Sequence, residues 1–144
     1  MLVVIGSDHA GYLLKEEVIK YLNEKGIEVL DKGTNSSESV DYPDFAHAVC
    51  ESVIENDCFG ILICYTGIGM SMAANKHKSI RAALVSIVED AILTREHNNA
   101  NVLCLSAKNL TVSNATTIVD AFLNTEFAGG RHERRVNKLN AIEE

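Results

Sequence analysis

No apolar run in this sequence approaches the roughly 20 residues that a membrane-spanning helix requires, so no membrane span is expected. Runs rich in lysine and arginine with interleaved aromatic residues are also absent, and the net charge is −7, so nucleic acid is not an expected partner. The start of the chain lacks the basic segment and the long apolar stretch of a signal peptide. Its short apolar run is typical of a first strand instead.

Signals for metals, nucleotides and disulfides are equally sparse. The four cysteines form no CxxC pair, and they share no zinc-ligand spacing with the histidines. We therefore expect no metal site, and unpaired thiols without an export signal fit the reducing cytoplasm. No GK[ST] completes a P-loop, and the glycine pair at 67 and 69 is too short for a dinucleotide fingerprint, so nucleotide binding is not expected.

Short apolar runs alternate with amphipathic stretches along the 144 residues, of which 47% are hydrophobic, and we expect one domain over residues 1–144. The expected strands lie at 2–5, 27–30, 59–64, 80–85 and 101–105, and the expected helices at 10–25, 43–53, 70–76, 89–97, 115–123 and 131–144. This alternation predicts a three-layer α/β fold. Its centre is a doubly wound, Rossmann-like sheet of about five parallel strands, and a helix ends the chain.

The central stretch ILICYTGIGMSMAANK, residues 61–76, reads as a buried strand, a glycine turn and a helix. Such a turn directs free backbone N–H groups toward the end of the strand, where an anion can bind. Cys64 and Thr66 are two residues apart, so an extended chain points both side chains the same way. The pattern favours acid–base or covalent chemistry at Cys64, although packing alone also explains glycines in such turns and cysteine in a core.

Other polar residues follow the predicted strands at their carboxyl ends, where doubly wound folds bind ligands. Asp8 and His9 follow the first strand, and Lys108 follows the fifth. Asp8 also suits a helix cap, which leaves two interpretations open. His97 and Asn98 precede the fifth strand, so they reach this region only if the helix before them is short; otherwise they form a polar helix end.

Arg131 and Arg135 are four residues apart and share a helix face, which suits a phosphate clamp or an ordinary solvated face. The remaining histidines, His47, His77 and His132, have no functional spacing, and we expect structural roles for them.

Taken together, these segments resemble the type B ribose-5-phosphate isomerases, within a family that includes the galactose-6-phosphate isomerase subunits. The matching segments are GSDHAG at 6–11, DKGT at 31–34, SVDYPD at 39–44, TGIGMS at 66–71, AANK at 73–76, REHN at 95–98, GGRH at 129–132 and RV at 135–136. They span nearly the whole chain in order. No single segment is decisive, but the ordered set is specific.

The resemblance implies aldose–ketose isomerisation of a sugar phosphate without a cofactor. It implies Cys64 as the base that moves a proton between C1 and C2, Thr66 as its assistant, and Asp8 and His97 as the residues that open the sugar ring. The resemblance also implies residues that contact the substrate. The turn contributes Gly67, Ile68, Gly69, Met70 and Ser71, and Asn98 contacts the sugar hydroxyls. The phosphate is contacted by His9, Lys108, Arg131 and Arg135.

The resemblance also implies a homodimer or homotetramer with sites at the subunit interface, in which Tyr42 is lent by the partner. We expect D-ribose 5-phosphate and D-ribulose 5-phosphate as substrates, as in the non-oxidative pentose phosphate pathway. A six-carbon substrate such as allose or galactose 6-phosphate, or a non-catalytic sugar-phosphate-binding protein, is the alternative. Two positions depart from the family: Tyr65 stands where glycine is usual, and Lys108 stands where arginine is usual.

Overall fold

The computed structural model describes residues 1–142, in which helices alternate with strands. The strands are β1 (Leu2–Ser7), β2 (Glu28–Asp31), β3 (Phe59–Cys64), β4 (Ala82–Leu84) and β5 (Val102–Ser106). The helices are α1 (Tyr12–Glu24), α2 (Tyr42–Asn56), α3 (Ile68–Ala74), α4 (Val88–Asn98), α5 (Val112–Asn124) and α6 (Arg131–Asn140). None of these helices within residues 1–142 is long and apolar enough to cross a membrane.

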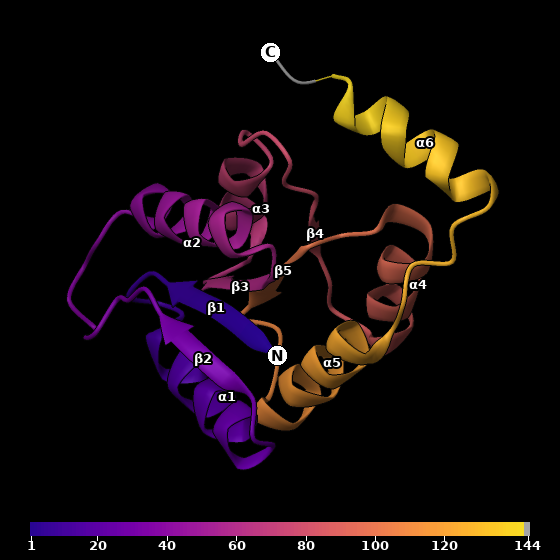
Figure 1. The fold of residues 1–144 in the computed structure, drawn as a ribbon. Coiled ribbons are helices and arrows are strands. Elements are labelled where there is room, and N and C mark those ends of the chain that lie inside the picture. The colour runs from indigo at the N-terminus through magenta and orange to yellow at the C-terminus, as the bar shows by residue number, and fades with distance from the viewer. Residues whose placement is uncertain (143–144) are drawn as a thin grey trace.

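The strands form one parallel sheet in the order β2-β1-β3-β5-β4, which confirms the predicted fold class (Figure 1). The chain starts in β1, builds outward to β2, then returns to β3 and continues to the other side. The strand order therefore reverses between β1 and β3, and ligands of doubly wound sheets bind beyond the carboxyl ends at such a reversal. We call that side of the sheet the carboxyl edge, and the opposite side the amino edge.

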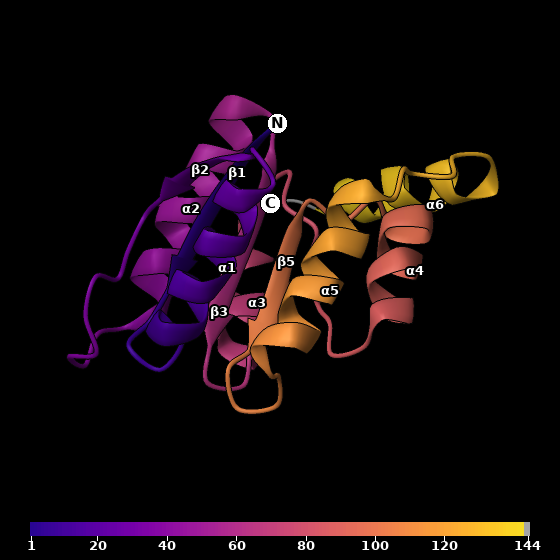
Figure 2. The ribbon, with the colours of Figure 1, turned by 90° about the horizontal axis from the view of Figure 1, so that it is seen from below.

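Helices cover both faces of the sheet. One apolar cluster joins β1, β3 and β5 to α1, α4 and α5, and the other joins the same strands to α2 and α3 (Figures 1 and 2). Alternation along β3 explains the division, because Ile61 and Ile63 enter the first cluster whereas Leu62 and Cys64 enter the second. Burying one such side chain contributes about 1.5–3 kcal/mol. The central strand is thus held from both sides, and the thiol of Cys64 faces α2 and α3.

A partly buried ion pair fixes the loop after β2 to the carboxyl edge. Lys15 of α1 is fully buried, and its Nζ donates to both carboxylate oxygens of Asp31 at 2.9 and 2.8 Å. Asp31 in turn accepts a hydrogen bond from the N–H of Gly33, whose carbonyl accepts the N–H of Ser7 at the end of β1. The first residues of this long loop are therefore held beside β1.

Most element boundaries differ from the predicted ones by a few residues, and three of the differences are described here. α3 begins at Ile68 rather than residue 70, since the helix starts directly after the turn glycine. β4 is shorter than residues 80–85 because it is an edge strand, and the side chain of Asn75 pairs with the free N–H and C=O of Ala82. α6 ends at Asn140, and residues 143–144 of the predicted helix lie outside the described part of the chain.

Candidate active site

Cys64 ends β3 at the point where the strand order reverses. Its side chain is only 5% exposed, and its Sγ accepts a hydrogen bond from the N–H of Gly67 at 3.2 Å. Gly67 has a φ of +79°, and a Cβ placed on it would lie 2.5 Å from Leu84 Cδ1 and 3.1 Å from the Leu105 carbonyl oxygen. Only glycine suits both the backbone conformation and the space. The turn therefore directs a backbone donor at the sulfur.

The turn also leaves two backbone donors without partners. The N–H of Ile68 donates to Thr66 Oγ1 at 3.2 Å, and the N–H of Ser71 donates to the Gly67 carbonyl at 3.1 Å. Between them, the N–H groups of Gly69 and Met70 donate to no other atom of residues 1–142. Unsatisfied N–H groups at a helix start attract negative charge, so this arrangement suits an oxygen that becomes anionic during a reaction.

Tyr42 lies over this turn in its own chain. A Cβ placed on Gly69 would be 2.7 Å from two carbons of the Tyr42 ring, so glycine makes room for the ring. The expectation that Tyr42 is lent by a partner is therefore wrong. The reason is that α2 and α3 pack on the same face of the sheet, and α2 begins with Tyr42 beside the start of α3.

Asp8 and His9 follow β1 at the same edge. The buried Asp8 accepts the N–H of Gly11 at 3.0 Å, and Gly11 is itself the N-cap residue of α1, so Asp8 holds the turn before the helix rather than capping its first turn. The ring of His9 accepts the N–H of Val40 at Nδ1, 3.1 Å away. Because Nδ1 is an acceptor here, a neutral His9 carries its proton on Nε2. This bond ties the loop before α2 to the site and leaves Nε2–H as a donor for a ligand.

Sequence reasoning missed Gly11, which allows α1 to start directly against β3. A Cβ at this position would lie 2.4 Å from the Ile63 carbonyl oxygen, a backbone atom that cannot move aside cheaply. The close approach places the Asp8 loop next to the end of β3. The glycine at the start of a predicted helix, in the segment GSDHAG, was the available signal.

The two unusual residues, Tyr65 and Lys108, contact each other. Lys108 Nζ lies 5.8 Å from the centroid of the Tyr65 ring, and the Lys108 N–H donates to the Tyr65 carbonyl at 2.8 Å. Tyr65 lies in the bend just beyond the end of β3, and its ring is directed toward Lys108. The ring is 57% exposed and therefore does not crowd the thiol.

The remaining candidate residues lie at the amino edge. α4 has 11 residues and so is about 16 Å long. It is therefore not the short helix that would bring His97 and Asn98 to Cys64 within one chain. Arg131 and Arg135 lie beside them, because α6 packs against α4 (Figure 2).

His132, for which we expected only a structural role, stacks on His97 with ring centroids 4.3 Å apart and planes 15° from parallel. Partial loss of hydration, followed by the nearby charges of His97, Arg131 and Arg135, lowers the pKa of His132. The stacked rings and the two arginines thus form one cluster, in which the guanidinium groups carry the positive charge. Chain spacing does not reveal the stack, because it joins the end of α4 to the start of α6.

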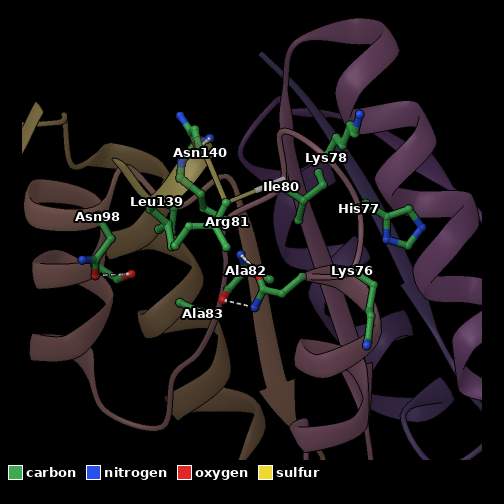
Figure 3. A pocket seen from close by; sticks show the side chains of 14 residues that line it. Lys76, His77, Lys78, Ile80, Arg81, Ala82, Ala83, Asn98, Leu139 and Asn140 are labelled. Atoms are coloured by element: carbon green, nitrogen blue, oxygen red, sulfur yellow. Dashed lines mark hydrogen bonds between the residues drawn. The ribbon is translucent and has the colours of Figure 1, made fainter. Parts of the chain in front are cut away.

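A cavity of about 630 Å³ also opens at the amino edge, between the α3–β4 segment, α4 and α6 (Figure 3). Its lining includes Asn98 together with basic side chains from 76 to 81 and the apolar Leu139 of α6. Asn98 Oδ1 accepts a hydrogen bond from Thr94 at 3.1 Å. The cavity contains none of the residues around Cys64, so its size alone does not identify the reaction centre.

Comparison with known proteins agrees with the resemblance found in the sequence. A family model described as Ribose/Galactose Isomerase matches residues 3–139. Ribose-5-phosphate isomerase B of Escherichia coli strain K12 is 46% identical over 99% of this chain and 96% of its own length. The crystal structure of a ribose 5-phosphate isomerase from Thermotoga maritima is 53% identical and superposes with a TM-score of 0.96 over 98% of each chain.

A second solved structure, ribose-5-phosphate isomerase B from Mycoplasma genitalium, contains bound ribulose-5-phosphate. It is 47% identical, with a TM-score of 0.93 over 97% of this chain and 94% of the other.

Proposed function

Because this chain belongs to the ribose/galactose isomerase family, we propose that it is an aldose–ketose isomerase that interconverts D-ribose 5-phosphate and D-ribulose 5-phosphate. One observation carries the mechanism: the thiol of Cys64 sits beside a turn with two unpaired backbone donors. Abstraction of a proton next to a carbonyl requires a base and donors where negative charge develops. Both requirements are present within one turn.

In the proposed reaction, the Cys64 thiolate takes the proton from C2 of the open-chain aldose. The electrons of that C–H bond form the C1=C2 double bond, and the C1 carbonyl oxygen becomes an enediolate oxygen. The N–H groups of Gly69 and Met70 stabilise this negative charge. Transfer of the O2 proton to O1 and return of the carbon-bound proton from the Cys64 thiol to C1 then give the ketose. No electrons leave the substrate, so no redox cofactor is required.

Thr66 and Asp8 assist from the same edge. The Thr66 hydroxyl accepts the N–H of Ile68, which leaves its own proton for an enediolate oxygen. We assign opening of the sugar ring to Asp8 together with His97, and contacts to the hydroxyls to Asn98. The Nε2–H of His9 is available to the phosphate group.

The roles assigned to His97 and Asn98 require a second copy of the chain, since these residues lie at the opposite edge from Cys64. We propose a homodimer or a homotetramer in which α4 and α6 of one subunit complete the site of another. Apolar side chains exposed around the turn and β4 support an interface there: Ile68, Met72, Leu84 and Ile87. Association then brings Arg131 and Arg135 to the phosphate.

The phosphate site proposed here combines residues from both subunits. His9 and Lys108 come from the carboxyl edge, and Arg131 and Arg135 come from the partner. Guanidinium groups hold phosphate oxygens in a bidentate manner, whereas Lys108 provides a single charge. Four free thiols suit a reducing compartment, and we place the enzyme in the cytoplasm, in the non-oxidative pentose phosphate pathway.

A panel of sugar phosphates tests the proposal. The purified protein should convert D-ribose 5-phosphate to D-ribulose 5-phosphate in the presence of a chelator, with solvent deuterium entering the product at C1. Faster turnover of allose or galactose 6-phosphate would assign a six-carbon substrate instead. Saturable binding of every sugar phosphate without deuterium incorporation would show a binding protein and overturn the mechanism.

A further inference from the structure

A pair of histidines lies on the outer surface of α2 and the segment after α3, outside the proposed active site. His47 Nδ1 and His77 Nε2 are 2.9 Å apart, although 30 residues separate them in the chain. The far nitrogen of each ring also has a partner. His47 Nε2 contacts the carboxylate of Glu51 one turn later, and His77 Nδ1 lies 3.0 Å and 3.1 Å from the carbonyl oxygens of Ala73 and Ala74.

These outer contacts determine where the ring protons lie. A carboxylate and a carbonyl accept hydrogen bonds, so both outer nitrogens, His47 Nε2 and His77 Nδ1, carry protons. In the neutral rings, the two inner nitrogens then both present lone pairs, only 2.9 Å apart. Two facing lone pairs repel each other unless a cation lies between them. The arrangement therefore has room for one cation, which is either a shared proton or a metal ion.

We propose that His47 and His77 form a two-histidine site for a divalent transition metal ion, with Glu51 and the Ala73 carbonyl as outer partners of the ligands. Metal-binding histidines ordinarily donate their second N–H to a carboxylate or a backbone carbonyl, which fixes the ring tautomer and orientation. Both rings of this pair already do so. No group of three or more ligating side chains exists among the described residues, so water completes the coordination.

The nitrogen separation selects the class of metal. With metal–nitrogen bonds of about 2.0–2.1 Å, two ligands at a right angle are about 2.9 Å apart, and two at the tetrahedral angle about 3.4 Å apart. The observed 2.9 Å fits the right angle of tetragonal Cu²⁺ or Ni²⁺ and fits tetrahedral Zn²⁺ less well. The ring planes are tilted by 31°, so the His47 ring must turn for the two lone pairs to converge on one ion, and the side chain of Glu51 can follow it because both are exposed.

Local charge does not oppose this assignment. Glu51 offsets part of the charge of the ion. Lys76 and Lys78 flank His77 but are exposed, so solvent screens them, and Figure 3 shows their side chains leading away from the His77 ring in opposite directions. A metal ion here would join α2 to the segment that follows α3. It would take no part in the proton transfer at Cys64.

Titration of the tag-free protein with Ni²⁺, followed by calorimetry, tests the site. We expect one ion per chain, and at least tenfold weaker binding in both His47→Gln and His77→Gln. Glu51→Gln should weaken binding by about 10- to 100-fold, as loss of an outer partner does at other metal sites. His132→Gln is the matched control, because it removes a histidine from the other ring pair and should leave the Ni²⁺ affinity unchanged.

Three further measurements distinguish loss of binding from loss of folding. Circular dichroism should show each variant folded, since His47 and Glu51 are exposed. Saturating Ni²⁺ should broaden the imidazole resonances of His47 and His77 before those of other histidines, and raise the melting temperature of the parent protein but not of His47→Gln. Absence of Ni²⁺ binding at millimolar concentration, or unchanged affinity in both histidine variants, would overturn the proposal.

Discussion

Replacement of Cys64 by alanine separates the proposed chemistry from the fold. The change removes a sulfur atom from the cluster between the sheet and α2, and it removes the acceptor of the Gly67 N–H. The lost burial is worth about 0.8 kcal/mol and the hydrogen bond about 1 kcal/mol. A total cost of about 2 kcal/mol is small beside the roughly 5–15 kcal/mol by which domains are stable, so the variant should fold.

The cost in rate should be much larger than the cost in stability. Loss of a general base lowers a rate by about 10²–10⁴-fold, which corresponds to about 2.7–5.4 kcal/mol of transition-state stabilisation. The donors of Gly69 and Met70 remain, so the variant should still bind sugar phosphate. Turnover of D-ribose 5-phosphate and incorporation of solvent deuterium should therefore fall together while the dissociation constant changes little.

Cys50→Ala is the matched control. Cys50 lies in the same apolar cluster and is fully buried, so its removal costs stability without altering the turn. Its thiol is no base, because burial raises the pKa of Cys50 to about 12. If Cys64→Ala retained near-normal turnover, or if Cys50→Ala lost turnover to the same extent while folded, the base would lie elsewhere and the mechanism would be wrong at its centre.

Four other outcomes can be measured on the same preparations. Arg131→Ala and Arg135→Ala should each weaken substrate binding at least tenfold through loss of charge-assisted contacts worth about 1.5–3 kcal/mol, and normal KM values in both would place these arginines on a solvated face. A mixture of Cys64→Ala and Arg131→Ala chains should regain activity, because each mixed dimer contains one intact site; no regain after confirmed subunit exchange would argue for sites within one chain. Gly67→Ala should lower the free energy of unfolding by more than about 1 kcal/mol, measured by denaturant titration, because of its positive φ and the 2.5 Å approach to a side-chain carbon. Iodoacetamide should modify Cys64 more slowly when substrate is bound, and mass spectrometry should find Cys50 unmodified in the folded protein.

The extent of β3 was predictable because its apolar run ends abruptly at a glycine turn. The alternation of short apolar runs with amphipathic stretches was enough to predict the parallel sheet. The contacts of Tyr42 were not predictable, since they depend on how α2 packs on α3. The pairing of His47 with His77 was equally hidden, because side chains 30 residues apart meet only through that same packing. Regular spacing reveals residues that share an element, whereas contacts between elements require the fold.

Tyr65 illustrates the difference between a backbone role and a side-chain role at the same position. Its carbonyl accepts hydrogen bonds from Ser106 Oγ at 2.9 Å and from the Lys108 N–H at 2.8 Å, and these bonds hold the loop after β5 against the end of β3. A glycine at this position would provide the same carbonyl acceptor. The glycine that is usual in the family and the tyrosine of this chain are therefore both compatible with these two backbone contacts.

The division of the site between the two edges has a consequence for catalysis. Binding energy from the phosphate, which does not react, is useful when it orients the reacting carbons at the base. The proposed base and oxyanion donors belong to the carboxyl edge, whereas the arginines proposed to bind the phosphate belong to the amino edge. One chain alone would therefore hold the reacting carbons but lack most of the positioning energy. On this proposal, subunit association supplies the orientation on which the rate depends.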